Sequence, residues 1–317
     1  MSNAQTITPR PFRQRLIRDI KRYKFIYLLG FLCLTYYVIF CYLPMGGIVI
    51  AFKDFRAARG IFGSKWANPW YKYFDQFFNG YYFWRLLRNT LLINLQDLIF
   101  GFPAPIILAL LLNELRNQNF KRVVQTITYL PHFLSWVIVA GFTMSILSMD
   151  NGSLNIALES LNLIDEPINF LSIPRYFWTI IVTTNLWKSI GFGSIVYMAA
   201  IAGIDPQLYE AASLDGATKF QQVFLITLPS IVPIITIFLI LEIGNLLNAG
   251  FEDLLLLGSN PALRNVADVI DTYVYRVGIS NSQYSYATAV GLFKAVISVT
   301  LLSGANFFAR KVGHSLW

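Results

Sequence analysis

Charged residues are scarce in this chain, and histidine and cysteine are scarcer still. Asp, Glu, Lys and Arg make up 13% of the 317 residues, whereas an average soluble domain is about a quarter charged. The two histidines and two cysteines are too few for a clustered metal site, which needs several ligands together. We therefore expect no metal, and we interpret His132 as a structural residue at a membrane edge.

Two sequence signatures of catalysis are also missing. The chain has no GxxxxGK[ST] loop for nucleotide phosphates, so we do not expect it to bind and hydrolyse ATP by itself. It also has no Gly-x-Ser-x-Gly turn for a nucleophilic serine. We predict that the chain is not an enzyme, has no catalytic residues and holds no cofactor of its own. The energy for its work must then come from a partner.

The two cysteines do not indicate a disulfide. Cys33 and Cys41 lie on one predicted helix, about 12 Å apart by helical rise, which is too far for a bridge. We interpret both as lipid-facing or packing residues.

Instead of charged residues, the chain contains long runs of apolar residues. Hydrophobic residues make up 56% of the chain, and a run of about 20 apolar residues is long enough to cross a bilayer as a helix. Short charged stretches separate six such runs, which predict an all-α polytopic membrane protein with a single domain at 25–309. The predicted spans are 25–52, 89–112, 129–149, 176–203, 224–250 and 286–309.

Charge at the two ends predicts the orientation. Residues 1–24 carry seven Lys and Arg against the single acid Asp19, and Arg310 and Lys311 follow the last run. Basic flanks remain in the cytoplasm. We therefore predict a cytoplasmic basic arm at 1–24 and a cytoplasmic tail at 310–317.

The loops predict the opposite face. The acidic segments 150–175 and 251–285 are expected outside. Segment 53–84 is also outside by alternation, although its Lys and Arg run against the charge bias. Its mixture of aromatic and basic residues suits the membrane interface. Such mixtures also bind nucleic acid, but a position between two spans disfavours this, so we expect the lipid bilayer and no nucleic acid as a partner.

Segment 204–223, between the fourth and fifth runs, has the marks of a helical turn. Asp205 can accept the free N–H groups of a helix start, and Pro206 fits the first helical position. Gly216 allows a backbone angle that a side chain would oppose. Charge bias independently puts this segment on the cytoplasmic side. The alternative is an ordinary amphipathic connector.

The spacing within this segment is specific. Glu-Ala-Ala at 210–212 is followed by three residues, Gly216, nine residues, Ile226, one residue and Leu228-Pro229. The pattern resembles, without a gap, the EAA loop of binding-protein-dependent ABC importer permeases, a cytoplasmic helix-turn-helix that sits in a groove of an ATPase subunit. The resemblance implies that the ATPase-coupling residues are Glu210, Ala211, Ala212, Ser213, Asp215 and Gly216.

Nearly the whole chain looks like the carbohydrate-uptake branch of that family, which imports polysaccharide-derived oligosaccharides. The strings that carry this resemblance include Phe102-Pro-Ala-Pro, Ala202-Gly-Ile-Asp-Pro206, Gly244-Asn-Leu-Leu-Asn248 and Ser315-Leu-Trp317.

What the resemblance implies is the type I ABC importer fold and an alternating-access mechanism in a bacterial cytoplasmic membrane. The implied partners are a second permease subunit, two cytoplasmic ATPase subunits that bind ATP and Mg, and an extracytoplasmic solute-binding protein.

Polar residues inside the predicted spans are candidates for a substrate path. Ionisable residues there cost about 2.5 to 3.5 kcal/mol each on insertion scales, so they should face the bundle interior, a cavity or one another. Asp97 and Lys294 can pair with other buried charges as structural glue, an alternative that stays open. We expect residues 242, 245 and 249 to share one helical face. The candidate path residues are Asn185, Lys188, Glu242, Asn245 and Asn248.

Other functions fit part of the pattern. An ion-coupled secondary transporter would use the buried acids and lysines as coupling sites, and its uptake would survive ATP depletion. A structural or assembly protein would use segment 204–223 for docking alone. Within the importer class, a non-sugar solute is the runner-up substrate, and the basic outer segment favours an anionic oligosaccharide such as a uronate.

Overall fold

The computed structural model describes residues 19–311 and Gly313. Most of the predicted arm at 1–24, and residues 312 and 314–317 of the predicted tail, lie outside the described residues. Regular structure in the described part is helical apart from one antiparallel hairpin, which pairs β1 (Lys53–Asp54) with β2 (Lys65–Trp66). The prediction of an all-α protein is confirmed.

The helices follow one another with short connections, and several long ones contain a π or 3₁₀ turn. In chain order the α-helices are α2 (Lys24–Tyr37), α3 (Leu43–Met45), α4 (Gly60–Gly63), α5 (Lys72–Phe78), α6 (Phe83–Gln96), α7 (Pro103–Glu114), α8 (Gln118–Tyr129), α9 (Trp136–Ile146), α10 (Ser153–Ser160), α11 (Pro174–Ala202), α12 (Pro206–Leu214), α13 (Lys219–Gln222), α14 (Leu228–Gly244), α15 (Glu252–Leu257), α16 (Arg264–Ala267), α17 (Ile270–Tyr275) and α18 (Tyr284–Lys311).

The described residues contain four continuous helices that are long and apolar enough to cross a membrane, namely Lys24–Phe52, Phe83–Glu114, Lys219–Gly244 and Tyr284–Lys311. Two further helix pairs pass the same test but are bent. They are Gln118–Phe133 with Trp136–Ile146, bent by 106°, and Pro174–Ala202 with Pro206–Leu214, bent by 71°. Counting each bent pair as one span gives six, the number that the sequence predicts.

The third span differs from the straight helix expected at 129–149. α8 begins within the stretch expected to be a cytoplasmic loop and runs into a 3₁₀ turn, Leu130–Phe133. Pro131 has no N–H with which to continue a helix. The chain then restarts as α9, whose N-cap Ser135 accepts a hydrogen bond from the Ile138 N–H at 3.4 Å. Two helices at a sharp angle therefore replace one.

The helix of the fifth span, α14, ends at Gly244, before the expected end at 250. The Asn245 N–H donates to the carbonyls of Leu241 and Glu242, at 3.1 and 3.0 Å, and the chain then turns at Gly250, where φ is +84°. The expectation that residues 242, 245 and 249 share one helical face is wrong, because residues 245–250 are not helical. The helix of the second span also differs from the expectation, since α6 begins at Phe83 rather than near 89.

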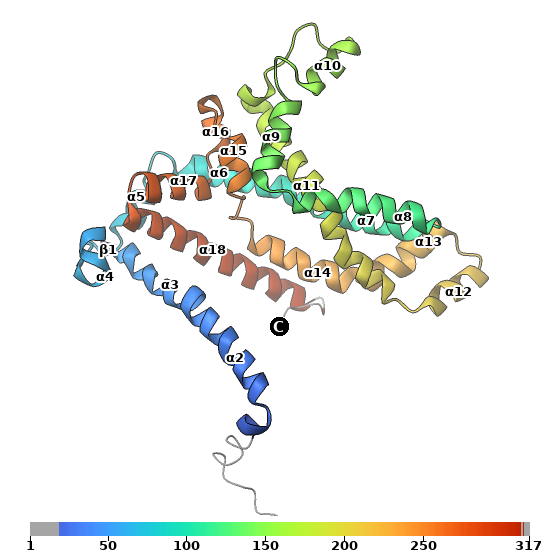
Figure 1. The fold of residues 1–317 in the computed structure, drawn as a ribbon, viewed down its shortest axis with the longest axis horizontal. Coiled ribbons are helices and arrows are strands. Elements are labelled where there is room, and N and C mark those ends of the chain that lie inside the picture. The colour runs from blue at the N-terminus through green and yellow to red at the C-terminus, as the bar shows by residue number, and fades with distance from the viewer. Residues whose placement is uncertain (1–18, 312, 314–317) are drawn as a thin grey trace, which may run out of the picture.

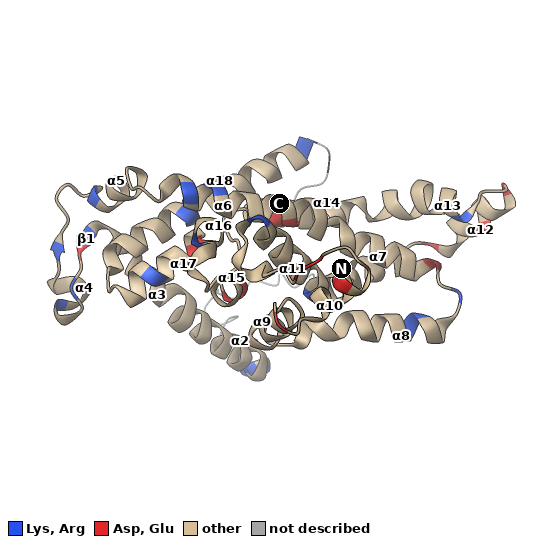
Figure 2. Ribbon diagram, turned by 90° about the horizontal axis from the view of Figure 1, so that it is seen from above, with Lys and Arg blue, Asp and Glu red and all other residues tan. Residues whose placement is uncertain are grey.

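The two ends of the molecule carry different segments. Figure 1 shows β1, α4 and α5 at one end of the long axis, and α12 and α13 at the other. Lys and Arg are frequent around β1, α4 and α5, whereas long stretches of the central helices carry no charge (Figure 2). A segment at one end is therefore connected to the other end by helices that run the length of the molecule.

α11 is the central packing element. Its residues Phe177 and Ile181 pack against Leu254 and Leu257 of α15 in one buried cluster. Further along, its Tyr197 belongs to a second cluster with side chains of α7 and α14. Lipid tails are as apolar as these side chains, so close van der Waals packing is what holds such clusters together in a membrane. α11 therefore packs against both the loop between α14 and α18 and the helices next to α12.

Candidate functional site

Local capping builds the helix-turn-helix at 204–223. The Asp205 carboxylate accepts a hydrogen bond from the Gln207 N–H at 3.0 Å and caps α12. α12 ends in a Schellman motif, in which Gly216 has a φ of +80° and the Ala217 N–H donates to the Ala212 carbonyl at 2.9 Å. The sequence-based expectation of a helix opened by Asp205 and closed by Gly216 is confirmed.

The second arm of this segment has its own cap. Thr218 and Gln221 form a capping box at the start of α13, with the Thr218 N–H donating to the Gln221 side-chain oxygen at 2.7 Å. Each arm of the helix-turn-helix is thus fixed by hydrogen bonds between residues that lie only a few positions apart in the chain.

Side chains also tie the two arms to each other. Gln222 Nε2 donates to Ser213 Oγ at 2.8 Å, and the Ser213 hydroxyl donates to the Tyr209 carbonyl at 2.7 Å. The hydroxyls of Tyr209 and Thr227 lie 2.9 Å apart. Gln222 and Thr227 are buried, so each of the two bonds between the arms has one partner that is shielded from water. We call Tyr209, Ser213, Gln222 and Thr227 the coupling lock, because they join α12 to the helix that continues into α14.

The outer surface of the same segment is open to solvent. Leu214 is 89% exposed and Phe220 is 72% exposed. Of the residues that the resemblance assigns to coupling, Ala212 is half-buried and the other five are exposed. Exposed apolar side chains beside the carboxylates of Glu210 and Asp215 are typical of a surface that a partner covers.

A cavity of about 590 Å³ brings together three of the five predicted path residues, Asn185, Lys188 and Asn248. It lies between α6, α11 and the loop after α14, and its lining also contains Asp97 and Asp253. Asn185 Nδ2 donates to Asp253 Oδ2 at 3.2 Å. Burial raises the pKa of Asp253 above its ordinary value, although the bond from Asn185 opposes this. The cavity is thus lined by amides and carboxylates, groups that hydrogen-bond to hydroxyl-bearing solutes.

Glu242 lines a neighbouring cavity of about 370 Å³. Asp97 and Ser189 line both cavities, so the two are adjacent. Asn245, the fifth predicted path residue, lines neither of these two cavities, and it caps the end of α14. Asn245 therefore does not line the cavities that hold the other four.

Both lysines of the predicted spans are engaged by protein groups. Lys188 Nζ donates to the carbonyls of His132 and Leu134, at 2.9 and 2.6 Å. Lys294 forms an ion pair with Asp271 and donates to Asn248 Oδ1 at 3.0 Å. Neither ammonium group is therefore an open donor for a solute.

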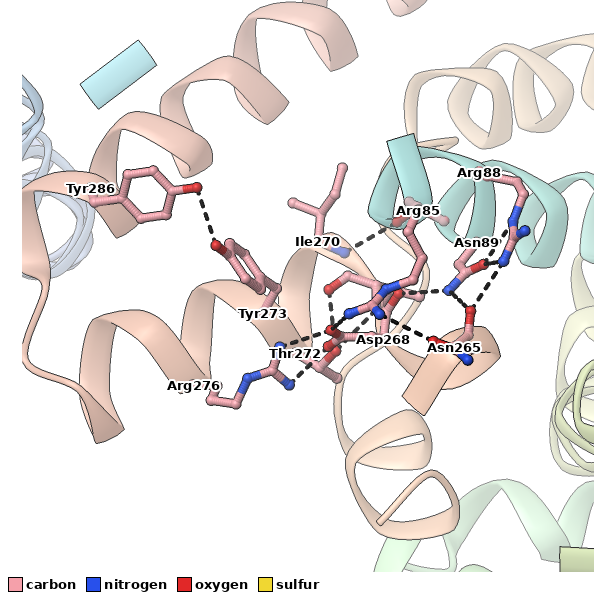
Figure 3. Close-up of polar contacts among 12 residues, drawn as sticks. Arg85, Arg88, Asn89, Asn265, Asp268, Ile270, Thr272, Tyr273, Arg276 and Tyr286 are labelled. Atoms are coloured by element: carbon pink, nitrogen blue, oxygen red, sulfur yellow. Dashed lines mark hydrogen bonds and ion pairs between the residues drawn. The ribbon is translucent and has the colours of Figure 1, made fainter. Parts of the chain in front are cut away.

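A buried ionic cluster anchors the loop between α14 and α18 (Figure 3). The sequence did not indicate this cluster. Arg276 binds the Asp268 carboxylate through two bonds, at 2.8 and 2.9 Å, and Arg85 adds a third at 3.0 Å. Asn89 donates to the carbonyls of Asp268 and Asn265, at 2.9 and 3.0 Å. The ion pair raises the pKa of Arg276. This cluster fixes the loop that carries Asp253 and Asn248 onto α6.

A match to a family model shows which protein family this architecture belongs to. The model described as "Binding-protein-dependent transport system inner membrane component" matches residues 101–314, which include α12, α13 and all helices after them. The chain belongs to this family. It is therefore a multi-pass membrane permease of the ABC importer type.

Two relatives from Bacillus subtilis (strain 168) match this permease along almost its whole length. Protein LplB is 48% identical, over 92% of this chain and 90% of its own. The "Polygalacturonan/rhamnogalacturonan transport system permease protein YteP" is 44% identical, over 95% of this chain and 92% of its own.

Solved structures agree with the sequence relatives. The permease superposes with a TM-score of 0.84 and 41% identity on a chain of a bacterial ABC transporter involved in the import of the acidic polysaccharide alginate, covering 94% of this chain and 99% of that one. A second structure, of the alginate transporter in complex with an alginate pentasaccharide-bound periplasmic protein, gives a TM-score of 0.85 and 40% identity, with coverage of 95% and 99%. The prediction of an ABC importer permease fold is confirmed.

Proposed function

We propose that this permease forms one half of the membrane pathway of an ATP-driven importer for an oligosaccharide. The observation that carries the coupling role is the capped helix-turn-helix α12–α13, which exposes Leu214, Phe220 and Glu210 at one end of the molecule. One of two cytoplasmic ATPase subunits, which bind ATP and Mg, covers this surface. A second permease subunit completes the pathway.

An extracytoplasmic solute-binding protein delivers the sugar at the opposite end. Both termini and segment 204–223 face the cytoplasm, and segments 150–175 and 251–285 face outward, as the charge bias indicates. Segment 53–84 faces outward by alternation of the spans. ATP brings the ATPases together, α12 moves with them, and the cavity lined by Asn185, Asp253 and Asn248 opens outward. Hydrolysis returns it to the inward-open state.

The polysaccharides named for YteP and for the alginate transporter support a carbohydrate substrate. The cavity lining supports it independently, since carboxylate and amide oxygens accept hydrogen bonds from sugar hydroxyls.

The test of the coupling role is a pull-down from the native cell of wild-type permease and of a variant that carries Glu210→Lys and Gly216→Pro. We expect an ATPase and a second permease to co-purify with the wild type, and the ATPase alone to be lost from the variant. The matched control is Asp54→Asn, at the far end of the molecule, which should retain every partner. Absence of an ATPase from the gently solubilised wild type would overturn the proposal.

The substrate is tested with radiolabelled trigalacturonate and galactotriose, which differ in their carboxylates, in proteoliposomes containing the complete importer. Uptake of either sugar that requires ATP and survives collapse of the ion gradient supports the proposal. Uptake of neither sugar would sink the carbohydrate assignment, and ATP-independent uptake would indicate a secondary transporter.

A further inference from the structure

The break between α8 and α9 leaves carbonyl groups without helical partners, and one lysine meets them. Lys188 Nζ donates to the carbonyls of His132 and Leu134, at 2.9 and 2.6 Å, and lies 3.4 Å from that of Pro131. Carbonyls at a helix end carry partial negative charge, and a cation placed there stabilises the end. The ammonium group also lies 5.3 Å from the centre of the Trp136 ring, at the start of α9. One side chain of α11 thus contacts both sides of the break.

Two more residues of α11 hold the same region. Gly191 lies against the backbone of Thr128 in α8, where a Cβ atom would come within 2.0 Å of the Thr128 carbonyl oxygen. The rings of Phe192 and His132 stack, with centroids 3.9 Å apart and planes 1° from parallel. A glycine permits close backbone approach, and the stacked rings fix the 3₁₀ turn beside it.

These three residues share one face of α11. Positions 188, 191 and 192 are related by i, i+3 and i+4, the spacings at which side chains lie side by side on a helix. We call Lys188, Gly191 and Phe192 the clamp. Its three contacts differ in kind, yet all of them bind the short stretch from Thr128 to Trp136.

The contacts of Lys188 distinguish two roles for it. An ammonium group has three donors, and three backbone carbonyls lie within hydrogen-bond distance of this one. A carboxylate of a sugar would have to displace them and leave the carbonyls of His132 and Leu134 without the ammonium group that they accept from, which costs free energy. Lys188 lines the cavity, but its charge is directed at the protein.

We propose that the clamp makes the broken third span move as one body with α11, and that Lys188 is a positioning residue rather than a substrate ligand. The proposal rests on the coupling role of α12, because α11 leads through a short turn at residues 203–205 directly into α12. Movement of α12 is then carried along α11 to His132 and Trp136, which line the cavity. The clamp thereby connects the ATPase end of the permease to the wall of the substrate pathway.

The test compares Lys188→Met, Lys188→Arg and Phe192→Ala in the complete importer in nanodiscs, with two readouts. Hydrogen exchange of the backbone amides of residues 128–139 reports the clamp without any substrate. We expect exchange to be about tenfold faster in Lys188→Met and in Phe192→Ala, because local opening becomes easier. Lys188→Arg keeps a cation at the carbonyls and should restore most of the protection. Tyr176→Phe, which removes a hydroxyl at the other end of α11, is the control and should exchange as the wild type does.

The second readout is ATP-driven uptake of trigalacturonate and galactotriose. Lys188→Met should lower the maximal rate about tenfold for whichever sugar the wild type transports, because a misplaced wall slows the conformational step. It should leave the concentration for half-maximal uptake within about twofold.

Unchanged exchange in both Lys188→Met and Phe192→Ala would overturn the clamp. A half-maximal concentration that rises for trigalacturonate and not for galactotriose would make Lys188 a substrate ligand instead. If the wild type takes up neither sugar, the carbohydrate assignment fails while the exchange measurement still decides the clamp.

Discussion

At the scale of single residues, the protein binds both lysines of its predicted spans with its own groups. Lys294 pairs with Asp271, and Lys188 is bound by backbone carbonyls. An unpaired charge in a bilayer is costly, so such residues face partners or a cavity. Of the two roles that the sequence left open for the buried lysines, the structure favours structural glue. The polar groups that the cavity presents to a solute are instead the carboxylates and amides around Asp253.

Asp268 is the residue whose loss should destabilise the permease most. Its side chain is 2% exposed and pairs with both Arg85 and Arg276. Removing one partner of a buried ion pair leaves the other charges uncompensated, which typically costs about 3 kcal/mol. We therefore expect Asp268→Asn to lower the thermal unfolding midpoint of the detergent-solubilised permease clearly.

The matched control for that prediction is Asp54→Asn, at an exposed ion pair with Lys72. Hydrogen bonds from Tyr73 and Lys72 lower the pKa of Asp54. The contribution of Asp54 to stability is therefore full at neutral pH and is lost as the pH falls below about 4. Exposed pairs contribute at most about 1 kcal/mol, so a larger loss in Asp54→Asn than in Asp268→Asn would contradict this ranking.

At the scale of elements, the coupling lock decides whether α12 transmits force. A turn between two short helices would absorb a push if its arms moved independently. The bonds from Gln222 to Ser213 and between Tyr209 and Thr227 prevent this, because they link α12 to the helix that continues into α14. Each of these two bonds has one buried partner, Gln222 or Thr227, and leaving a buried polar group unpaired is costly.

Gln222→Ala and Tyr209→Phe should therefore reduce the number of sugar molecules imported per ATP hydrolysed. Loss of about 1 kcal/mol of coupling corresponds to about a fivefold lower ratio. We expect ATP hydrolysis by the assembled complex to continue, because the exposed surface of α12 is unchanged. Uptake and phosphate release measured in the same proteoliposomes give the ratio. Tyr176→Phe, which removes a hydroxyl at the other end of α11, is the control, and an unchanged ratio in both lock variants would rule the lock out.

At the scale of the whole molecule, the long axis separates two faces. β1, α4 and α5 lie at one end, and α12 and α13 lie at the other (Figure 1). The loop between α7 and α8 lies at the same end of the molecule as α12 and α13 (Figures 1 and 2). This arrangement agrees with charge bias for most loops, but the basic segment 53–84 disagrees with it. We expect the topology that alternation of the spans gives, with segment 53–84 outside.

Cysteine labelling tests the orientation in a variant whose Cys33 and Cys41 are replaced by serine. Phe62→Cys, 98% exposed, and Leu163→Cys, 66% exposed, should react with a membrane-impermeant maleimide in intact spheroplasts. Arg116→Cys, in the exposed loop between α7 and α8, should react after permeabilisation alone. The opposite pattern would invert the proposed topology and, with it, the docking side of the ATPases.

Features that depend on neighbours in the chain were determined by the sequence. Runs of about 20 apolar residues must lie in a membrane as helices, because a bilayer offers no partner for free backbone groups. Asp205 and Gly216 set the start and end of α12 through bonds to residues at most a few positions away. The membrane class and the helix-turn-helix could therefore be predicted.

Which polar side chains meet was decided by the tertiary structure. Asn185 and Asp253 are 68 positions apart, and Arg85 and Asp268 are 183 apart. The partners of Lys188 are backbone carbonyls exposed by a break in another helix, and no residue type or spacing signals them. Asn245 was misplaced because the end of α14 depends on how the following loop packs. Such contacts follow from which helix faces lie together, a property of the packed bundle rather than of any one segment.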